Sequence, residues 1–125
     1  MSEQEALEKF GQFLMTKVRD EAITDWRMIA DGTMKSQRAQ DLRQTLAGVP
    51  EDHRSVLLGL VPEIVDTVLH HLMWGLEQEG DIDVAIQVNE SERIESLRDA
   101  SDGLSGELYS DSGWIASFSK ESKKE

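Results

Sequence analysis

The chain has 125 residues, of which 38% are apolar and 30% are charged, and its formal net charge is −12. This length suits one domain with one core, and this charge disfavours nucleic acids and anionic membrane surfaces, because both carry dense negative charge. No uninterrupted apolar run approaches the roughly 18 residues of a membrane span, and no cysteine is present for disulfides or thiolate metal sites. The first residues, MSEQEALEKF, lack the basic start and apolar stretch of a secretory signal. We therefore expect a soluble, cytoplasmic protein.

The first part of the chain is predicted to be helical. Apolar residues recur at steps of three and four from Leu7 to Ile29, which places them on one stripe of a helix that ends near Gly32. A second, shorter amphipathic helix is expected after Ser36, and a third after Pro50.

A longer helix is predicted over residues 62–79. Because Pro62 has no amide hydrogen and clashes with the preceding turn, we expect a break or kink at residues 59–61. At 100° per residue, His70 falls on the polar side of this helix and His71 at the edge of its apolar face. The residues predicted to face the core are Val61, Ile64, Val65, Val68, Leu72 and Leu76.

The C-terminal third is predicted to form a small sheet. Apolar and polar residues alternate over residues 82–88, which is the period of a half-buried strand. A short helix with Ile94, Leu97 and Ala100 inward is expected next. Two further strands are predicted to form a hairpin around residues 111–113, with Gly113 at a positive φ and Trp114 facing the helices.

The expected fold class is therefore α+β. An N-terminal layer of three to four helices would pack on a three-stranded, at least partly antiparallel sheet of β-α-β-β order. We expect a single domain over residues 1–119 and a disordered tail over residues 120–125, because the tail has no apolar side chain that could offset the cost of ordering it.

One segment, residues 55–92, contains eight carboxylates and no Lys or Arg, although residues 1–79 and residues 80–125 each carry a net charge of −6. Such a field attracts cations or basic proteins. The leading interpretation is a non-catalytic binding protein for a basic protein partner, such as an immunity-type inhibitor or a regulator, since opposed fields accelerate encounter. The predicted contact residues are acids near the end of the long helix and one aromatic anchor: Asp66, Trp74, Glu77, Glu79, Asp81 and Asp83.

A weaker pattern points to a metal site. Glu63, Asp66 and His70 stand three and four residues apart, and oxygen and imidazole donors at this spacing could meet one divalent cation. His53 or an acid at positions 81–83 could complete the shell. The same spacing also describes a solvated helix face on which Asp66 pairs with His70.

Two alternative functions follow from these patterns. A metal at Glu63, Asp66 and His70 would make the chain a metal-dependent hydrolase, with His71 or Glu77 as acid-base partner. A structural homodimer could instead form through the apolar stripe of the first helix. No cofactor motif is present in the sequence, so we expect no cofactor, and a divalent metal at this site is the one exception that the pattern leaves open.

Overall fold

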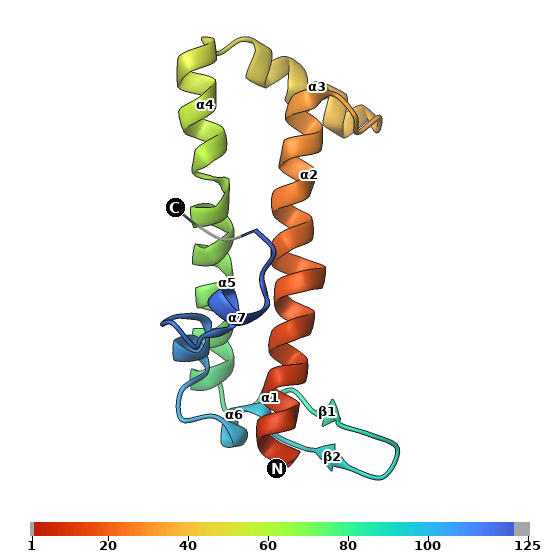
Figure 1. Cartoon of the computed structure of the whole chain (residues 1–125), viewed down its shortest axis with the longest axis vertical. Helices are drawn as coiled ribbons and strands as arrows, with labels where there is room; N and C mark the ends of the chain where they lie inside the picture. The colour runs from red at the N-terminus through yellow and green to blue at the C-terminus, as the bar shows by residue number, and fades with distance from the viewer. Residues whose placement is uncertain (1, 122–125) are drawn as a thin grey trace.

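The computed structural model describes residues 2–121 and shows a long helical hairpin with two arms (Figure 1). The first arm is one continuous helix made of α1 (Ser2–Phe13), the π-helical segment η1 (Leu14–Arg19) and α2 (Asp20–Asp31). Helix α3 (Gln37–Ala47) crosses between the arms, and the second arm consists of α4 (Glu51–Gly59) and α5 (Val61–Gln78). The short elements that follow are β1 (Ile86–Gln87), β2 (Arg93–Ile94), α6 (Leu97–Ala100), the 3-10 helix η2 (Leu104–Leu108) and α7 (Trp114–Phe118).

The predicted ends of the long helices are confirmed. Helix α2 ends at Gly32, whose φ of 83° is the left-handed conformation that glycine adopts without steric cost. The second arm breaks at Leu60, between the end of α4 and the start of α5. Pro62 lies in the first turn of α5, where its missing amide hydrogen would have no intrahelical acceptor.

The predicted three-stranded sheet is wrong. In the described part of the chain the only sheet is a two-stranded antiparallel one, in which Ile86 lies opposite Ile94 and Gln87 opposite Arg93. The alternating segment at residues 82–88 forms only two residues of strand, and Ile82 at its start is exposed. Ile94, expected in a short helix, lies in β2 instead. The fold is therefore mainly helical rather than α+β.

The predicted hairpin around residues 111–113 is also wrong, because residues 114–118 form helix α7. Gly113 has a φ of −74°, not a positive one. Glycine is needed there for another reason: a Cβ atom at Gly113 would lie 1.9 Å from the carbonyl oxygen of Tyr109. Trp114 is buried as expected, but it is held in the core by a helix that also buries Ile115.

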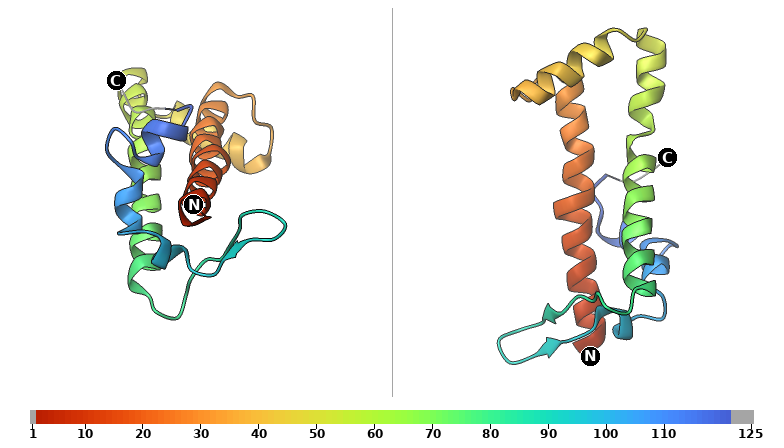
Figure 2. Two further views of the ribbon diagram at one scale, coloured as in Figure 1. Left: turned by 60° about the horizontal axis from the view of Figure 1, so that its bottom comes forward. Right: turned by 180° about the vertical axis from the view of Figure 1, so that it is seen from behind.

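The hydrophobic core lies between the lower halves of the two arms, where the short C-terminal elements wrap around α1 and α5 (Figure 2). Gly11 lets α1 approach closely, since a Cβ atom there would lie 2.6 Å from the indole of Trp114. By contrast, α4 has no buried residue. The core cluster is Leu7, Leu14, Met15, Leu69, Met73, Leu97, Leu104, Leu108, Trp114 and Ile115.

Helix α5 turns a different face to the core than the sequence predicts. Ile64, Val68 and Leu72 were expected inside, yet they are 60%, 64% and 45% exposed. The face that packs on the first arm is displaced around the helix and includes a carboxylate. Its residues are Val65, Asp66, Leu69, Met73 and Leu76.

The two helices of the second arm form one stretch, Glu51–Gln78, that is long and apolar enough to cross a membrane by length and composition alone. Core helices of soluble proteins meet the same criterion, so this is weak evidence for a span. Only 17% of its most apolar window is buried, however. A large apolar surface therefore remains uncovered on this arm.

The first residues of the predicted tail are placed against the first arm. The amide of Lys120 donates to Asp20 at 2.8 Å, and Glu121 pairs with Arg27 at 2.6 Å. The rest of the predicted tail, residues 122–125, lies outside the described residues.

Candidate functional site

The negative charge of the chain is concentrated at one end of the hairpin. We call this the acidic end and define it as residues 2–12 and 76–112, which include the start of α1, the end of α5, the β-hairpin, α6 and η2 (Figure 1). These residues carry fourteen Asp and Glu but three Lys and Arg, a net charge of −11. All other residues together contribute −1. Residues 76–112 alone carry −9 of this charge, and folding brings the −2 of residues 2–12 to the same end.

The three basic residues of the acidic end all bind neighbouring groups within that end. The ammonium group of Lys9 donates to the carbonyl oxygen of Gln87 at 2.7 Å, which ties β1 to α1. Arg98 donates to the carbonyl oxygens of Leu76 at 2.9 Å and Glu79 at 2.6 Å, so its positive charge lies at the C-terminus of α5. Arg93 pairs with Glu95 at 2.9 Å. Lys9 and Arg98 thus hold the backbone in place, while most of the surrounding carboxylates have no ion-pair partner within residues 2–121.

Asp83 has a structural role within the acidic end. Its carboxylate accepts hydrogen bonds from the amide of Val84 at 2.8 Å and from the hydroxyl of Ser96, and it lies 3.5 Å from Arg98. Burial opposes ionisation of this group, but the hydrogen bonds and the guanidinium outweigh it and hold the pKa of Asp83 below its ordinary value. The charged carboxylate thus fixes the entry into α6.

Glu92 joins the β-turn to the start of the chain. It accepts hydrogen bonds from the hydroxyl of Ser2 and from the side-chain amide of Asn89, and these bonds lower its pKa. The side chains of Glu79 and Asp81, in contrast, are exposed and make no recorded hydrogen bond among the described residues. They are among the acids of this end that a partner could reach without breaking a contact inside the protein.

The structure separates the predicted contact residues into two groups. Trp74, Glu79 and Asp81 are exposed near the end of α5, and Asp83 lies beside them in the following turn. Asp66 is buried and Glu77 is half-buried, and both carboxylates already accept hydrogen bonds from within the protein. Glu77 accepts hydrogen bonds from the amide of Ser105 at 3.1 Å and from its hydroxyl at 3.3 Å.

The predicted metal ligands do not converge. The carboxylate of Asp66 is 4% exposed and is gripped by Arg19 through bonds of 2.6 and 3.2 Å, so a guanidinium lies where a cation would have to bind. His70 shares a 3.1 Å hydrogen bond with the hydroxyl of Tyr109. The exposed ring of His71 lies edge-on to that of His70. In residues 2–121 no three His, Asp or Glu side chains form a group that could hold a metal ion.

Comparison with protein-family models, with curated proteins and with solved structures gives no match for this chain. Its function is therefore inferred from the chemistry of its own residues.

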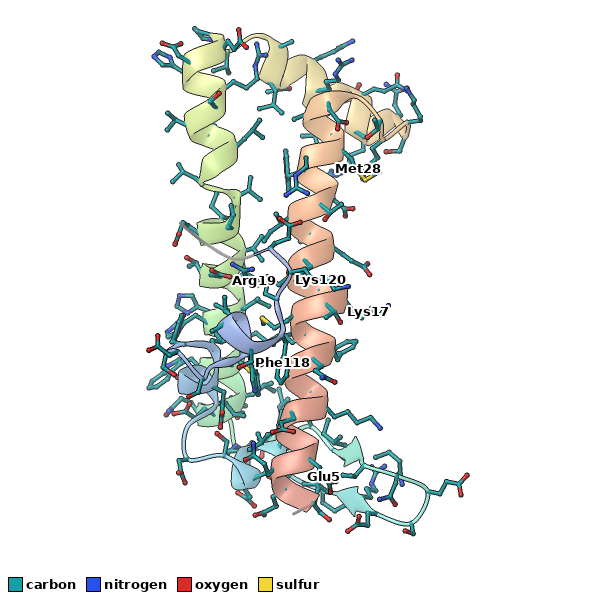
Figure 3. The ribbon with its side chains drawn as sticks, in the orientation of Figure 1. Glu5, Lys17, Arg19, Met28, Phe118 and Lys120 are labelled. Atoms are coloured by element: carbon teal, nitrogen blue, oxygen red, sulfur yellow. The ribbon has the colours of Figure 1, made fainter. Side chains whose placement is uncertain are left out.

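Sequence reasoning missed the buried role of Arg19. This side chain is fully buried between the two arms, where it also donates to the hydroxyl of Ser119 at 2.7 Å and to the carbonyl oxygen of Glu121 (Figure 3). A signal was present, because Arg19 stands four residues from both Met15 and Ile23 and so continues their inward stripe. The positive charge of Arg19 is too costly to bury unpaired, and the residue that neutralises it, Asp66, lies 47 residues further along the chain.

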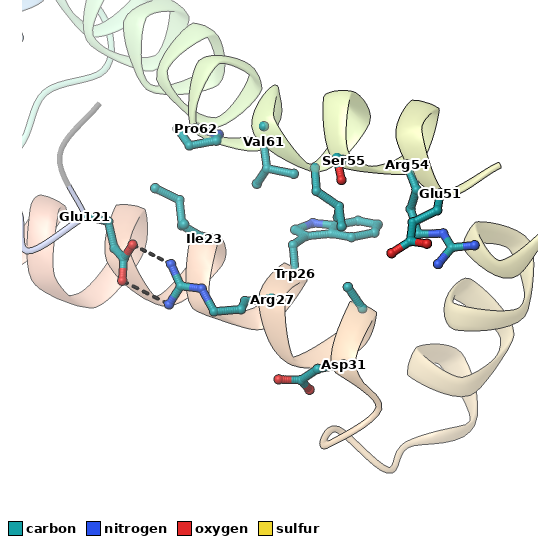
Figure 4. Close-up of a pocket in the computed structure, with 13 residues that line it drawn as sticks. Ile23, Trp26, Arg27, Asp31, Glu51, Arg54, Ser55, Val61, Pro62 and Glu121 are labelled. Carbon is teal, nitrogen blue, oxygen red and sulfur yellow. Dashed lines mark hydrogen bonds and ion pairs between the residues drawn. The ribbon is translucent and has the colours of Figure 1, made fainter. Parts of the chain in front are cut away.

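The upper half of the hairpin contains an open cleft of about 570 Å³ between α2 and α4. Trp26 projects into it from α2, and Arg27 at its edge pairs with Glu121 (Figure 4). Arg54 donates to the carbonyl oxygens of Leu46, in the last turn of α3, at 3.0 Å and of Val49, in the α3–α4 connection, at 2.9 Å. Both arginines that line the cleft are thus already engaged.

Proposed function

We propose that this chain is a non-catalytic, cytoplasmic binding protein whose acidic end contacts a basic protein partner, as an immunity-type inhibitor or a regulator would. The observation that supports this is the concentration of a net charge of −11 at one end of the hairpin. A field of this kind acts over several ångströms and speeds the encounter with a cationic surface.

Apolar groups beside the exposed acids are expected to slow the dissociation of the proposed complex. Trp74 is 48% exposed, and Ile82 is 56% exposed next to Asp81 in the chain. Partly exposed aromatic and aliphatic side chains serve as anchors when they are desolvated by a partner, and they mainly slow dissociation. Charge is therefore expected to control the association rate, and Trp74 the dissociation rate.

The test uses two charge-reversal variants of equal net charge. Glu79→Lys with Asp81→Lys changes the acidic end, and Glu21→Lys with Asp25→Lys changes exposed positions on α2. Each protein is used to capture partners from native extract, and association rates are then measured with the captured basic protein at low and high salt.

We expect the variant at the acidic end to associate about tenfold more slowly at low salt, with the difference shrinking at high salt because of screening. The α2 variant should stay within about twofold of the wild type. Equal losses in both variants would mean that only total charge matters, and no loss in either would show that the acidic end is not the contact surface.

The anchor is tested separately. Trp74→Ala should raise the dissociation rate by at least about tenfold, as expected for a central aromatic contact. Phe13→Ala is the matched control, because Phe13 is 52% exposed but lies on the first arm, whereas Trp74 lies on the helix that leads into Glu79 and Asp81. Metal content is measured on the same freshly purified protein. Stoichiometric metal that is lost on His70→Ala would support the hydrolase alternative in place of this proposal.

A further inference from the structure

The second arm carries an exposed apolar ridge on the side that faces away from the core. Every fourth residue from position 56 to position 72 is a large aliphatic one, and each is between 45% and 64% exposed. Residues four apart form the ridges through which helices pack against one another. The ridge consists of Val56, Leu60, Ile64, Val68 and Leu72.

The area of this surface matches that of a stable interface. With Leu57, the ridge exposes six aliphatic side chains at about half of their full area, which amounts to roughly 500 Å² of apolar surface. A standard protein interface buries about 800 Å² per partner, of which about 60% is apolar. Glu63, Asp66 and Glu77 point to other sides of the helix at 100° per residue, so the ridge itself is free of charge.

A groove lies next to the ridge. Leu57 and Ile64 border an apolar hollow of about 250 Å³ that Trp26, Leu46 and Val61 help to line. A surface that offers both a ridge and an adjoining groove is complementary to itself, which is the requirement of a two-fold symmetric interface. We infer that a second copy of this chain packs on the ridge of Val56, Leu60, Ile64, Val68 and Leu72, so that the protein is a homodimer.

The charge distribution sets the direction of packing. Parallel arms would place two acidic ends of −11 side by side, whereas antiparallel arms keep them at opposite ends of the dimer. The ridge is about 24 Å long at 1.5 Å per residue, which exceeds the Debye length of about 8 Å at physiological salt. The two-fold axis then passes near Ile64, at the middle of the ridge.

A lipid bilayer is the other apolar environment that could cover this face. It is disfavoured because the basic residues at the two ends of the second arm, Arg54 and Arg98, already donate to backbone carbonyl oxygens, and residues 55–92 contain no Lys or Arg that could anchor a membrane helix. The opposite side of the same helix also holds the Asp66–Arg19 pair against the first arm. The test below therefore includes neutral phosphatidylcholine vesicles.

The first measurement is sedimentation equilibrium over a dilution series. The wild type should pass from dimer to monomer, and Ile64→Gln with Val68→Gln should raise the dissociation constant at least tenfold with unchanged helical circular dichroism. The control, Phe13→Gln with Val18→Gln, replaces exposed apolar residues of the first arm and should stay within about twofold. Glu79→Lys with Asp81→Lys should also leave the dimer intact, which keeps this test separate from that of the proposed function.

The second measurement uses the absence of cysteine from the chain. In an antiparallel dimer Ile64→Cys crosslinks to itself on mild oxidation, and Val56→Cys crosslinks to Leu72→Cys only when the two variants are mixed. Self-crosslinking of Val56→Cys would overturn the antiparallel arrangement. A wild type that stays monomeric at all concentrations, or a monomer that floats with the vesicles, would overturn the homodimer.

Discussion

Removal of the carboxylate of Asp66 should destabilise the fold strongly. Asp66→Leu keeps a similar volume but leaves the buried guanidinium of Arg19 without its closest counter-charge, and breaking a buried ion pair in this way costs about 3–5 kcal/mol. Asp20 lies 3.9 Å from the same guanidinium and is nearly buried, so it offsets part of the loss. We therefore expect the lower value, about 3 kcal/mol, against a total stability of about 6–19 kcal/mol for 125 residues.

Urea denaturation followed by circular dichroism measures this loss, and the slope of the transition should not change. The double variant Arg19→Met with Asp66→Leu should recover most of the stability, because neither charge is then buried alone. Glu79→Gln is the matched surface control and should change stability by less than about 0.5 kcal/mol. The reasoning is refuted if Asp66→Leu costs less than about 1 kcal/mol, or if the double variant is as unstable as the sum of the two single changes.

Two further predictions concern the lower half of the hairpin. Gly11→Ala should lower stability by about 1–3 kcal/mol in thermal melts, because its Cβ atom would lie 2.6 Å from the indole of Trp114. Gly75→Ala is the control and should not be destabilising, because a Cβ atom there meets nothing within 4 Å. Equal effects of the two substitutions would contradict this account of Gly11. The pKa of Asp83 is lowered by folding, so its stabilising effect is complete above its ordinary pKa of 3.8 and is lost as the pH falls through the lowered value. Asp83→Asn should accordingly flatten the fall of stability seen in urea titrations as the pH drops below about 4, and an unchanged pH profile would show that the carboxylate makes no such contribution.

The face of α5 illustrates what sequence patterns can and cannot decide. Aliphatic residues cover nearly two sides of this helix, so the pattern alone does not say which side meets the core. The prediction took the side with Ile64 and Val68 as the core face and placed Asp66 with His70 on the polar side. The structure buries Asp66 because Arg19 comes from another helix to pair with it, and that contact has no local signature.

The predictions for the segments after α5 were wrong for a different reason. Alternation over residues 82–88 is too short to distinguish a strand from an extended loop that packs one side on α1. Trp114 and Phe118 are four residues apart, which fits one turn of helix as well as a strand. The helix boundaries succeeded because Gly32 and Pro62 act through their own backbone chemistry, which does not depend on distant contacts.

Most of the charge of the acidic end is contiguous in the sequence, in residues 76–112. What the sequence does not show is that α1 lies against β1, β2 and α6 and adds its own acids to that end. The exposed positions Glu79 and Asp81 were within reach of pattern reasoning. The hydrogen bonds from Lys9 and Arg98 to backbone carbonyl oxygens could not be predicted from sequence patterns.

The contact between Arg19 and Ser119 joins residues 100 positions apart. Because this contact closes a loop of 100 residues, we expect these bonds to form late on the folding pathway, after the two arms have met. Arg19 and Asp66 are closer in sequence, so their ion pair is expected to form first and the C-terminal segment to pack across the arms last.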